Sequence, residues 1–191
     1  MDRRQFIQAG SAASVLGVAA GCASTGGGSG AGGNVVVVGG GYGGATAAKY
    51  IRMWSEGRVN VTLVEPNDSF ISCPISNLVI GGSKQMADIT TPYDNLARRH
   101  GVKIIKDRAV SIDAGKRTVT LAGGTVLPYD RLVLSPGIEF MWDALPGLKK
   151  PGAQDKVLHS WNAGPQTVAL RRQLEAMPDG GVYALTIPLS P

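Results

Sequence analysis

The glycine spacing close to residue 39 is the first feature that could do chemistry. Gly39, Gly41 and Gly44 follow the G-x-G-x-x-G spacing, directly after the valine run Val35–Val38. In such a unit the first glycine permits a tight turn, the second lets a diphosphate approach the backbone, and the third lets the helix pack against the strand. Unpaired N–H groups at the start of the helix would then face the phosphates. The spacing predicts a dinucleotide-binding site.

A carboxylate lies at the sequence position where a dinucleotide-binding site requires an acidic residue. Glu65 ends a second apolar run, Val59–Val64, about 20 residues beyond Gly44, where an acid can accept hydrogen bonds from ribose hydroxyls. Glycine is abundant in this chain, with 27 of 191 residues, so the spacing alone is weak evidence. The preceding strand, the following helix and the acid together carry the prediction.

A cysteine is a further reactive side chain. Cys73 lies in the apolar stretch Phe70–Gly82, and Pro74 after it favours an extended or turn conformation. Taken alone, a single cysteine in an apolar stretch is usually a small buried hydrophobic residue. If Cys22 is lost or modified near the N-terminus, Cys73 has no intrachain disulfide partner.

Charge and composition argue against other classes of function. The formal net charge is +5, without a basic run or interleaved aromatic residues, which favours solubility over nucleic-acid binding. The two histidines, His100 and His159, are scattered. Because they form no cluster with cysteine or acidic residues at ligand spacing, we expect no metal site.

The elements that must position these residues follow from periodicity. β-branched valines suit a strand buried on both faces of a parallel sheet, and alanines at helical spacing after Gly44 indicate a helix. Pro92 near the start and Gly101 at the end favour a second short helix. The predicted elements of this part are strands at Val35–Val38, Val59–Val64 and Val102–Ile105, and helices from Ala45 to Trp54 and from Thr91 to Gly101.

The second half begins with alternating segments punctuated by glycines, which predict an antiparallel meander. The meander strands are Ala109–Ile112, Arg117–Leu121 and Thr125–Leu127, and a strand within Tyr129–Gly137 follows them. Beyond loop-like residues 138–162 we expect a helix at Gly164–Met177 and a buried strand from Val182. The predicted fold class is therefore α/β. It comprises a Rossmann-like domain at 34–150, a parallel sheet with a meander insert, and the start of a second, truncated nucleotide-type domain at 160–191.

The N-terminus has the features of an export signal. Residues 1–23 contain the pair Arg3-Arg4 beside Phe6 and then the apolar run Ala9–Ala20, which resembles a twin-arginine signal. The alternative is an ordinary secretory signal. Ala19–Cys22 also resembles a lipoprotein box, which would make Cys22 a lipid anchor. Residues 24–33 form a Gly/Ser-rich linker, and the expected localisation is periplasmic.

Several stretches together resemble the flavoprotein subunit of flavocytochrome c sulfide dehydrogenase. The fingerprint and the Tyr129–Gly137 block are shared with a wider family that includes sulfide:quinone reductases and type II NADH dehydrogenases. The Ser-Cys-Pro-Ile-Ser-Asn-Leu-Val-Ile-Gly-Gly stretch at 72–82 is the narrower signature. The resembling stretches are Val35–Arg52, Glu65–Gly82, Tyr129–Gly137 and His159–Gly181.

The resemblance implies FAD as the cofactor. Cys73 would carry the flavin through a thioether to its 8α-methyl carbon, a link that prevents loss of FAD outside the cytoplasm. Glu65 would bind the adenosine ribose, and the three fingerprint glycines would hold the diphosphate. The implied cofactor-binding residues are Gly39, Gly41, Gly44, Glu65, Cys73, Val110 beside the adenine, and Pro136 and Gly137 close to the cofactor.

The resemblance also implies sulfide as the substrate and a cytochrome c subunit as the partner. In that family, hydrosulfide attacks a redox-active cysteine pair, the flavin is reduced, and electrons pass singly to haem. Such a pair would follow residue 191, so we expect no catalytic residue within residues 1–191 and no sulfide oxidation by them alone. The alternatives are a sulfide:quinone reductase or NADH dehydrogenase, which would usually lack the Cys73 signature, and a non-catalytic FAD-binding fragment.

Overall fold

The computed structural model of the chain describes residues 32–186. The predicted export signal at 1–23, the Cys22 lipid anchor and nearly all of the linker lie outside the described residues. None of the helices within residues 32–186 is long and apolar enough to cross a lipid bilayer.

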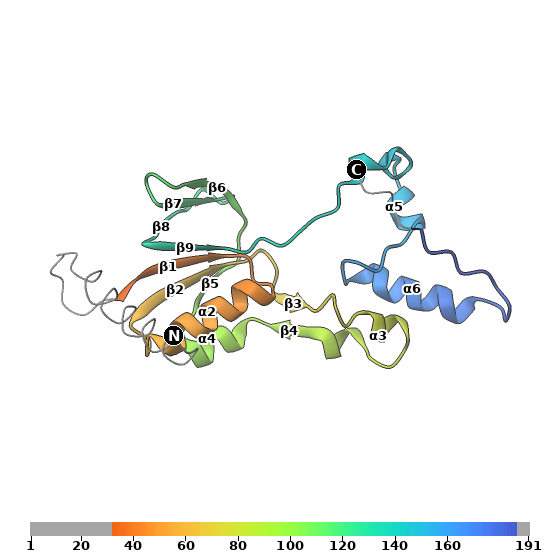
Figure 1. Cartoon of the computed structure of the whole chain (residues 1–191), viewed down its shortest axis with the longest axis horizontal. Helices are drawn as coiled ribbons and strands as arrows, with labels where there is room; N and C mark the ends of the chain where they lie inside the picture. The colour runs from red at the N-terminus through yellow and green to blue at the C-terminus, as the bar shows by residue number, and fades with distance from the viewer. Residues whose placement is uncertain (1–31, 187–191) are drawn as a thin grey trace, which may run out of the picture. The chain divides into compact units, whose positions relative to one another are not determined.

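A parallel sheet forms the centre of the fold. Within residues 32–186 it contains four strands in the order β5-β2-β1-β9 (Figure 1). This is the strand order of a Rossmann-like fold, and it confirms the predicted fold class. The sequence order reverses between β1 and β9, so ligands of such sheets bind beyond the carboxyl ends of these strands. The strands are β1 (Gly32–Val38), β2 (Val59–Val64), β5 (Lys103–Ile105) and β9 (Arg131–Leu134).

Strand β1 is buried on both faces, as its valine run predicts. Val35 and Val37 belong to a core cluster that includes Ala48 of helix α2 (Tyr42–Trp54). Val36 and Val38 belong to a second cluster on the opposite face. Successive strand side chains alternate between the faces, so the valine run joins the two cores. β1 begins at Gly32, two residues before the expected domain start at Asn34.

The predicted meander covers the second face. β6 (Ala109–Asp113), β7 (Thr118–Leu121) and β8 (Val126–Pro128) pair antiparallel. Val119 and Leu121 are buried in the cluster that contains Val36 and Val38. Helix α2 thus covers one face of the parallel sheet and the meander covers the other.

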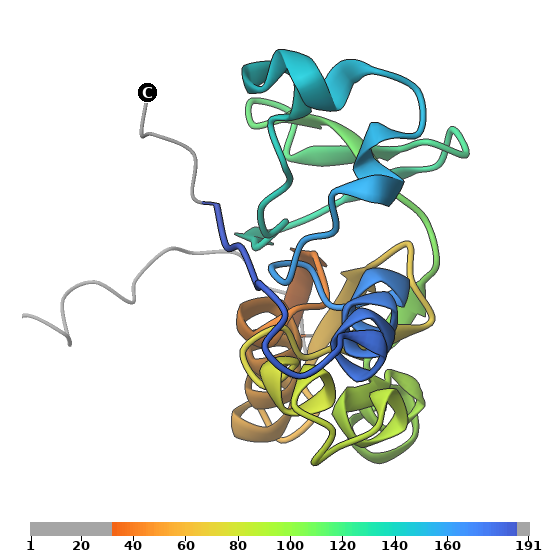
Figure 2. The same ribbon diagram turned by 90° about the vertical axis from the view of Figure 1, so that its right-hand side faces the viewer.

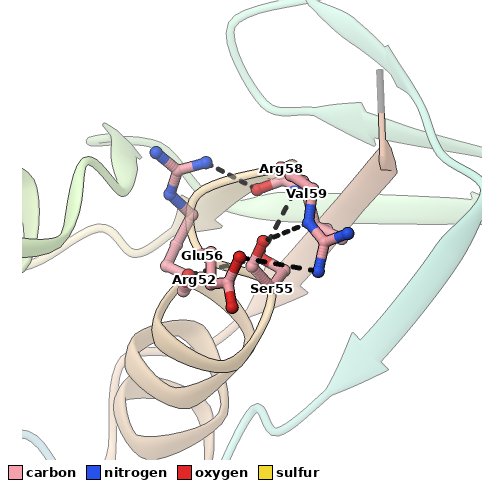
Figure 3. A network of polar contacts seen from close by, with 5 residues as sticks. All are labelled: Arg52, Ser55, Glu56, Arg58 and Val59. Carbon is pink, nitrogen blue, oxygen red and sulfur yellow. Dashed lines mark hydrogen bonds and ion pairs between the residues drawn. The ribbon is translucent and has the colours of Figure 1, made fainter. Parts of the chain in front are cut away.

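The turn from α2 to β2 is held by the guanidinium of Arg52. Its Nη1 donates to the carbonyl oxygens of Gly57 at 2.6 Å and Val59 at 2.7 Å. Its Nε donates to the carbonyl oxygen of His100, at the end of α4 (Asp94–His100), at 2.9 Å. Arg58 Nε also donates to the Ser55 carbonyl oxygen at 3.0 Å (Figure 3). The His100 and Ser55 carbonyl groups lie at helix ends, where carbonyls lack intrahelical partners, and the bonds to Gly57 and Val59 tie the last turn of α2 to the start of β2.

Pro92 does not lie in the first turn of a helix, and that prediction is wrong. It ends β4 (Thr90–Pro92), which pairs antiparallel with β3 (Ser69–Ile71), and helix α4 starts at Asp94. Proline lacks an N–H donor, and the short β3–β4 ribbon tolerates its loss because Pro92 is a terminal residue. Between β3 and β4 lie α3 (Asn77–Ile80) and the 3₁₀ turn η1 (Met86–Ile89).

The segment after β9 contains short helical turns and one longer helix. The predicted helix at 164–177 is confirmed as α6 (Pro165–Ala176). Helix α6 packs against α3 (Figure 2), where Arg171 Nη1 donates to the Ile80 carbonyl oxygen at 3.2 Å. The short turns are η2 (Trp142–Ala144), η3 (Pro146–Lys149) and α5 (Ala153–Lys156).

The buried strand expected from Val182 is absent from the described residues, which end at 186. Residues 182–186 have no strand structure, and the Val182 side chain is 91% exposed. A strand needs a hydrogen-bonded neighbour, and no described strand pairs with this segment. The apolar pattern alone therefore misled the prediction here.

Candidate dinucleotide site

The first fingerprint glycine joins the carboxyl ends of three strands. Gly39 has φ +94°, and a Cβ atom there would lie 2.0 Å from the Ser135 carbonyl oxygen. Its N–H donates to the Val64 carbonyl oxygen at 2.9 Å, and the Ser135 N–H donates to the Val38 carbonyl oxygen at 2.8 Å. Since both the positive φ and the close approach exclude a side chain, only glycine can complete this turn.

The other two fingerprint glycines differ in their surroundings. A Cβ atom on Gly44 would lie 1.8 Å from the Gly39 carbonyl oxygen, so this glycine allows α2 to approach the turn. Gly41 is the N-cap residue of α2, and a Cβ atom there would meet nothing within 4 Å. Gly44 therefore allows close packing of the helix, whereas Gly41 borders open space at the start of the helix, where a phosphate can be accepted.

Glu65 lies beside the glycine turn rather than apart from it. The residue is only 7% exposed, and its Oε2 accepts the Gly40 N–H at 2.7 Å. Its Oε1 accepts the backbone N–H of Asn67 at 2.9 Å and the Asn67 side-chain Nδ2 at 2.7 Å. A carboxylate offers about four acceptor positions. Three defined contacts therefore fix this carboxylate and leave capacity for a ribose hydroxyl.

Tyr93 completes the turn, and sequence reasoning missed it. Its side chain is 6% exposed, and its hydroxyl donates to the Gly40 carbonyl oxygen at 2.9 Å. Burial, and secondarily the charge of Glu65, raises the pKa of the Tyr93 phenol well above its usual value. The hydroxyl therefore stays a neutral donor at physiological pH. A partner 53 positions away in the sequence gives no local signal.

The predicted residues after β9 also reach the turn. Ser135 approaches Gly39, Pro136 follows, and Gly137 has φ +80°, a backbone conformation that favours glycine. Val110 is the extra residue of a bulge between Ala109 and Ser111 in the meander, and its side chain is 58% exposed. The structure thus gathers the glycines, Glu65, Pro136 and Gly137 at one edge of the sheet, and it places Val110 in the meander. Their roles in FAD binding stay predictions.

Cys73 lies in the turn between β3 and α3, and it is half-buried. Its Sγ lies 4.0 Å from the Ile71 carbonyl oxygen and 4.0 Å from Asn162 Oδ1. The turn is linked to the start of α2, because the Tyr42 hydroxyl is hydrogen-bonded to Ser72 Oγ. The Tyr42 ring also packs edge-on against Phe70, with ring centroids 4.7 Å apart. These contacts tie the Cys73 turn to Tyr42, the first residue of α2 after the N-cap Gly41.

The segment around Asn162 was not predicted to contact Cys73. Ala163 packs in a cluster with Val79 and Ile89, and Cys73 lies against that cluster. The narrower signature at 72–82 and the later Ser160–Thr167 segment, which are far apart in the sequence, therefore form one unit in the fold. The contact between Cys73 and the Asn162 segment could not be predicted because the two stretches are far apart in the sequence, although both belong to the same family resemblance.

His159 lies in an aromatic group outside the glycine turn. Its ring centroid is 4.4 Å from that of Phe140 and 5.9 Å from that of Trp142. Burial lowers the pKa of His159, and its buried Nδ1 has no hydrogen-bond partner among the described residues. Within residues 32–186 there is no cluster of three or more histidine, cysteine or acidic side chains arranged to hold a metal.

Comparison with known proteins gives a consistent family-level result. A family model described as pyridine nucleotide-disulphide oxidoreductase matches residues 33–176. The chain is 26% identical over 148 residues to a mitochondrial sulfide:quinone oxidoreductase of Dictyostelium discoideum, covering 76% of this chain and 32% of that protein. It is 58% identical over 38 residues to a sulfide dehydrogenase [flavocytochrome c] flavoprotein chain of Chlorobaculum thiosulfatiphilum, covering 20% of this chain and 77% of that sequence.

A solved structure shares the fold. The sulfide:quinone oxidoreductase from Aquifex aeolicus superimposes with a TM-score of 0.60 and 27% identity, over 74% of this chain and 31% of that chain. The chain thus spans about a third of the length of the two quinone oxidoreductases, with 32% and 31% coverage. The resemblance to the sulfide dehydrogenase flavoprotein and its wider family is confirmed.

Proposed function

Because this chain belongs to the pyridine nucleotide-disulphide oxidoreductase family, we propose that it forms the FAD-binding part of an exported flavoprotein that oxidises sulfide. The observation that carries the proposal is the arrangement at the glycine turn. Gly41 opens onto free space at the start of α2, and the carboxylate of Glu65 is held 2.7 Å from the neighbouring Gly40 nitrogen. A diphosphate and a ribose diol are the chemical groups that such a pair accepts.

FAD fits these residues, and each has a defined task in holding it. Gly39 and Gly44 shape the turn, Gly41 admits the diphosphate, and Glu65 accepts hydroxyls of the adenosine ribose. Flavin supplies the ability to take an electron pair from a sulfur substrate and release electrons singly. The protein contributes position and electrostatics, because backbone N–H groups and a helix N-terminus stabilise the anionic diphosphate.

We also propose that Cys73 is the covalent attachment point of the flavin. A half-buried thiol in a turn that is hydrogen-bonded to the start of α2 supports this role. So does the similarity to a sulfide dehydrogenase flavoprotein chain. A covalent link would retain FAD in the periplasm, the location that the paired arginines at residues 3 and 4 support. Electron transfer to a cytochrome c subunit is proposed for the whole protein on the same similarity.

The second candidate is a sulfide:quinone reductase with FAD bound non-covalently. The observation in its favour is the similarity to two quinone oxidoreductases, at 26% and 27% identity over about three quarters of this chain. Both candidates use the same glycine turn, so they differ at Cys73 and in the electron acceptor.

The test is flavin retention by the full chain. After expression with FAD and precipitation in acid, we expect yellow colour to stay with the polypeptide, and mass spectrometry to find flavin on the Cys73 peptide. Cys73→Ser should bind FAD but release it in acid. Release of flavin from the wild-type chain would favour the quinone reductase. A chain that takes up no flavin would overturn the FAD proposal itself.

A matched variant tests the glycine turn in the same assay. Gly41→Val places a side chain in the space that the diphosphate needs, so we expect at least a tenfold loss of FAD affinity. Its effect on folding should stay near 1 kcal/mol, because a Cβ atom there meets nothing within 4 Å and the main cost is that of a poorer helix N-cap. Unchanged flavin binding by Gly41→Val would contradict the assignment of the diphosphate site.

A further inference from the structure

Gly40 occupies the x position between the first two glycines of the fingerprint, where the motif allows any residue. In this structure, however, the position requires glycine. A Cβ atom on Gly40 would lie 2.5 Å from the Tyr93 hydroxyl oxygen and 2.6 Å from the adjacent ring carbon. The absence of a side chain lets the buried tyrosine reach the backbone of the turn. Gly40 and Tyr93 are therefore a matched pair, joined by the 2.9 Å bond from the hydroxyl to the Gly40 carbonyl oxygen.

Two successive peptide units of the turn are each held by one buried side chain. Glu65 accepts the N–H of Gly40, which belongs to the peptide unit between Gly39 and Gly40. Tyr93 donates to the carbonyl of Gly40, which belongs to the next unit, between Gly40 and Gly41. Both side chains are nearly fully buried, at 7% and 6% exposure, so these contacts are shielded from competing water.

Because the peptide bond is planar, the hydrogen bond from Tyr93 to the Gly40 carbonyl also sets the orientation of the Gly41 N–H. The described chain contains no cis peptide bond, so the Gly40 carbonyl and the Gly41 N–H point in opposite directions from one rigid plane. Because Tyr93 holds the carbonyl toward the buried side, the Gly41 N–H points away from it. A hydrogen bond to the carbonyl also polarises the amide and strengthens its N–H as a donor.

We propose that Tyr93 is a positioning residue for the diphosphate: its hydroxyl fixes the peptide unit between Gly40 and Gly41 and thereby presents the Gly41 N–H to an incoming phosphate oxygen. The inference rests on the proposed FAD site and deepens it. The turn is set before the cofactor arrives, so binding does not have to order it. Glu65 serves the ribose end, whereas Tyr93 acts at the diphosphate end through the backbone.

The test compares ligands with and without a diphosphate on a Cys73→Ser parent, which allows reversible binding. Affinities for FAD, ADP and adenosine are measured by NMR-monitored titration. For Tyr93→Phe, which keeps the ring, we expect about tenfold weaker binding of FAD and ADP, the loss of one hydrogen bond. Adenosine binding should stay within about twofold. Glu65→Gln should weaken adenosine binding as well, because its carboxylate serves the ribose.

Tyr50→Phe is the matched control, since it also removes a tyrosine hydroxyl but from a residue that stacks with Trp54 on α2. It should bind all three ligands like the parent. Tyr93→Phe that binds ADP like the parent, or that loses ADP and adenosine affinity equally, overturns the inference. If the Cys73→Ser parent itself binds no FAD, the proposed function fails instead.

A second measurement covers the case in which Tyr93→Phe does not fold. In the ¹⁵N-glycine-labelled parent, ADP should shift the Gly41 amide resonance strongly and leave that of Gly57, in the turn after α2, nearly unchanged. An ADP-induced shift at Gly41 no larger than that at Gly57 would also overturn the inference.

Discussion

The glycine turn and the Cys73 turn, which would hold opposite ends of the proposed cofactor, are built in different ways. The glycine turn is held by buried hydrogen bonds of 2.7 to 2.9 Å from strand ends, Glu65 and Tyr93. The backbone of the Cys73 turn is also hydrogen-bonded, with Ser76 Oγ donating to the Cys73 carbonyl oxygen at 2.8 Å, but the cysteine sulfur itself has its contacts at 4.0 Å and the turn is followed by the short helix α3. One region is part of the central sheet, whereas the other is attached beside it.

Local sequence is sufficient to specify the glycine turn, whereas the Cys73 turn depends on residues far along the chain. The glycine turn rests on a core that is buried on both faces of β1. The Cys73 turn rests on a smaller cluster that includes Ala163 and the α3–α6 contact, supplied from far along the chain. Regions with fewer buried contacts open at lower free energy than the core. We therefore expect the Cys73 turn, together with the α3–α6 contact, to unfold locally while the glycine turn stays folded.

The largest effect should come from Gly44→Ala, which acts on the glycine turn. The new Cβ atom would lie 1.8 Å from the Gly39 carbonyl oxygen, so helix and turn must move apart. We expect a loss of about 3 kcal/mol in the free energy of unfolding, measured by urea denaturation followed by circular dichroism.

Gly43→Ala is the matched control one residue earlier in the same helix. Its Cβ atom would lie 2.8 Å from the Ser135 hydroxyl oxygen and 3.9 Å from Ser135 Cβ, and the hydroxyl can rotate away. Alanine is the better helix former by about 0.5 to 1 kcal/mol, so this variant should be as stable as the wild type or more stable. Equal unfolding midpoints for the two variants would show that the helix and the turn are not in close contact at Gly44.

A smaller, local effect should follow from Arg171→Met, which acts on the Cys73 side. The change removes the bond to the Ile80 carbonyl oxygen and the 2.7 Å ion pair with Glu175, while keeping an apolar stem. We expect a loss of about 1 kcal/mol, expressed as faster hydrogen exchange at residues 77–82. Exchange at residues 34–48 should not change.

Arg172→Met is the control for that experiment, because Arg172 is the exposed neighbour on α6. It should leave exchange in both regions as in the wild type. If Arg171→Met accelerated exchange at residues 34–48 as strongly as at 77–82, the two regions would be one cooperative unit, and the comparison would fail.

The sequence predicted most of the central sheet because its signals are local. Val35–Val38 has the composition of a doubly buried strand, and two of the fingerprint glycines, Gly39 and Gly44, encode a turn whose geometry admits no side chain at their positions. Tyr93 could not be found in this way, because its partner Gly40 is 53 positions away and a tyrosine within a predicted helix has no distinctive spacing. Asn162 is 89 positions from Cys73 and was missed for the same reason.

The smallest effect concerns pH and also separates the two regions. Burial lowers the pKa of His159 in the folded chain, whereas in the unfolded chain it is about 6.5. Below pH 6.5 the unfolded state binds a proton that the folded state does not. The contribution of His159 to stability is therefore fully present above pH 6.5 and falls as the pH decreases toward the folded-state pKa.

In hydrogen exchange at pH 7.5 and 5.5, corrected for intrinsic rates, residues 159–171 should lose protection at the lower pH. His159→Phe should abolish this loss, because the ring remains beside Phe140 without a titrating nitrogen. His100→Gln, a change at the end of α4, should retain it, and a loss that persists in His159→Phe would assign the pH dependence to other groups.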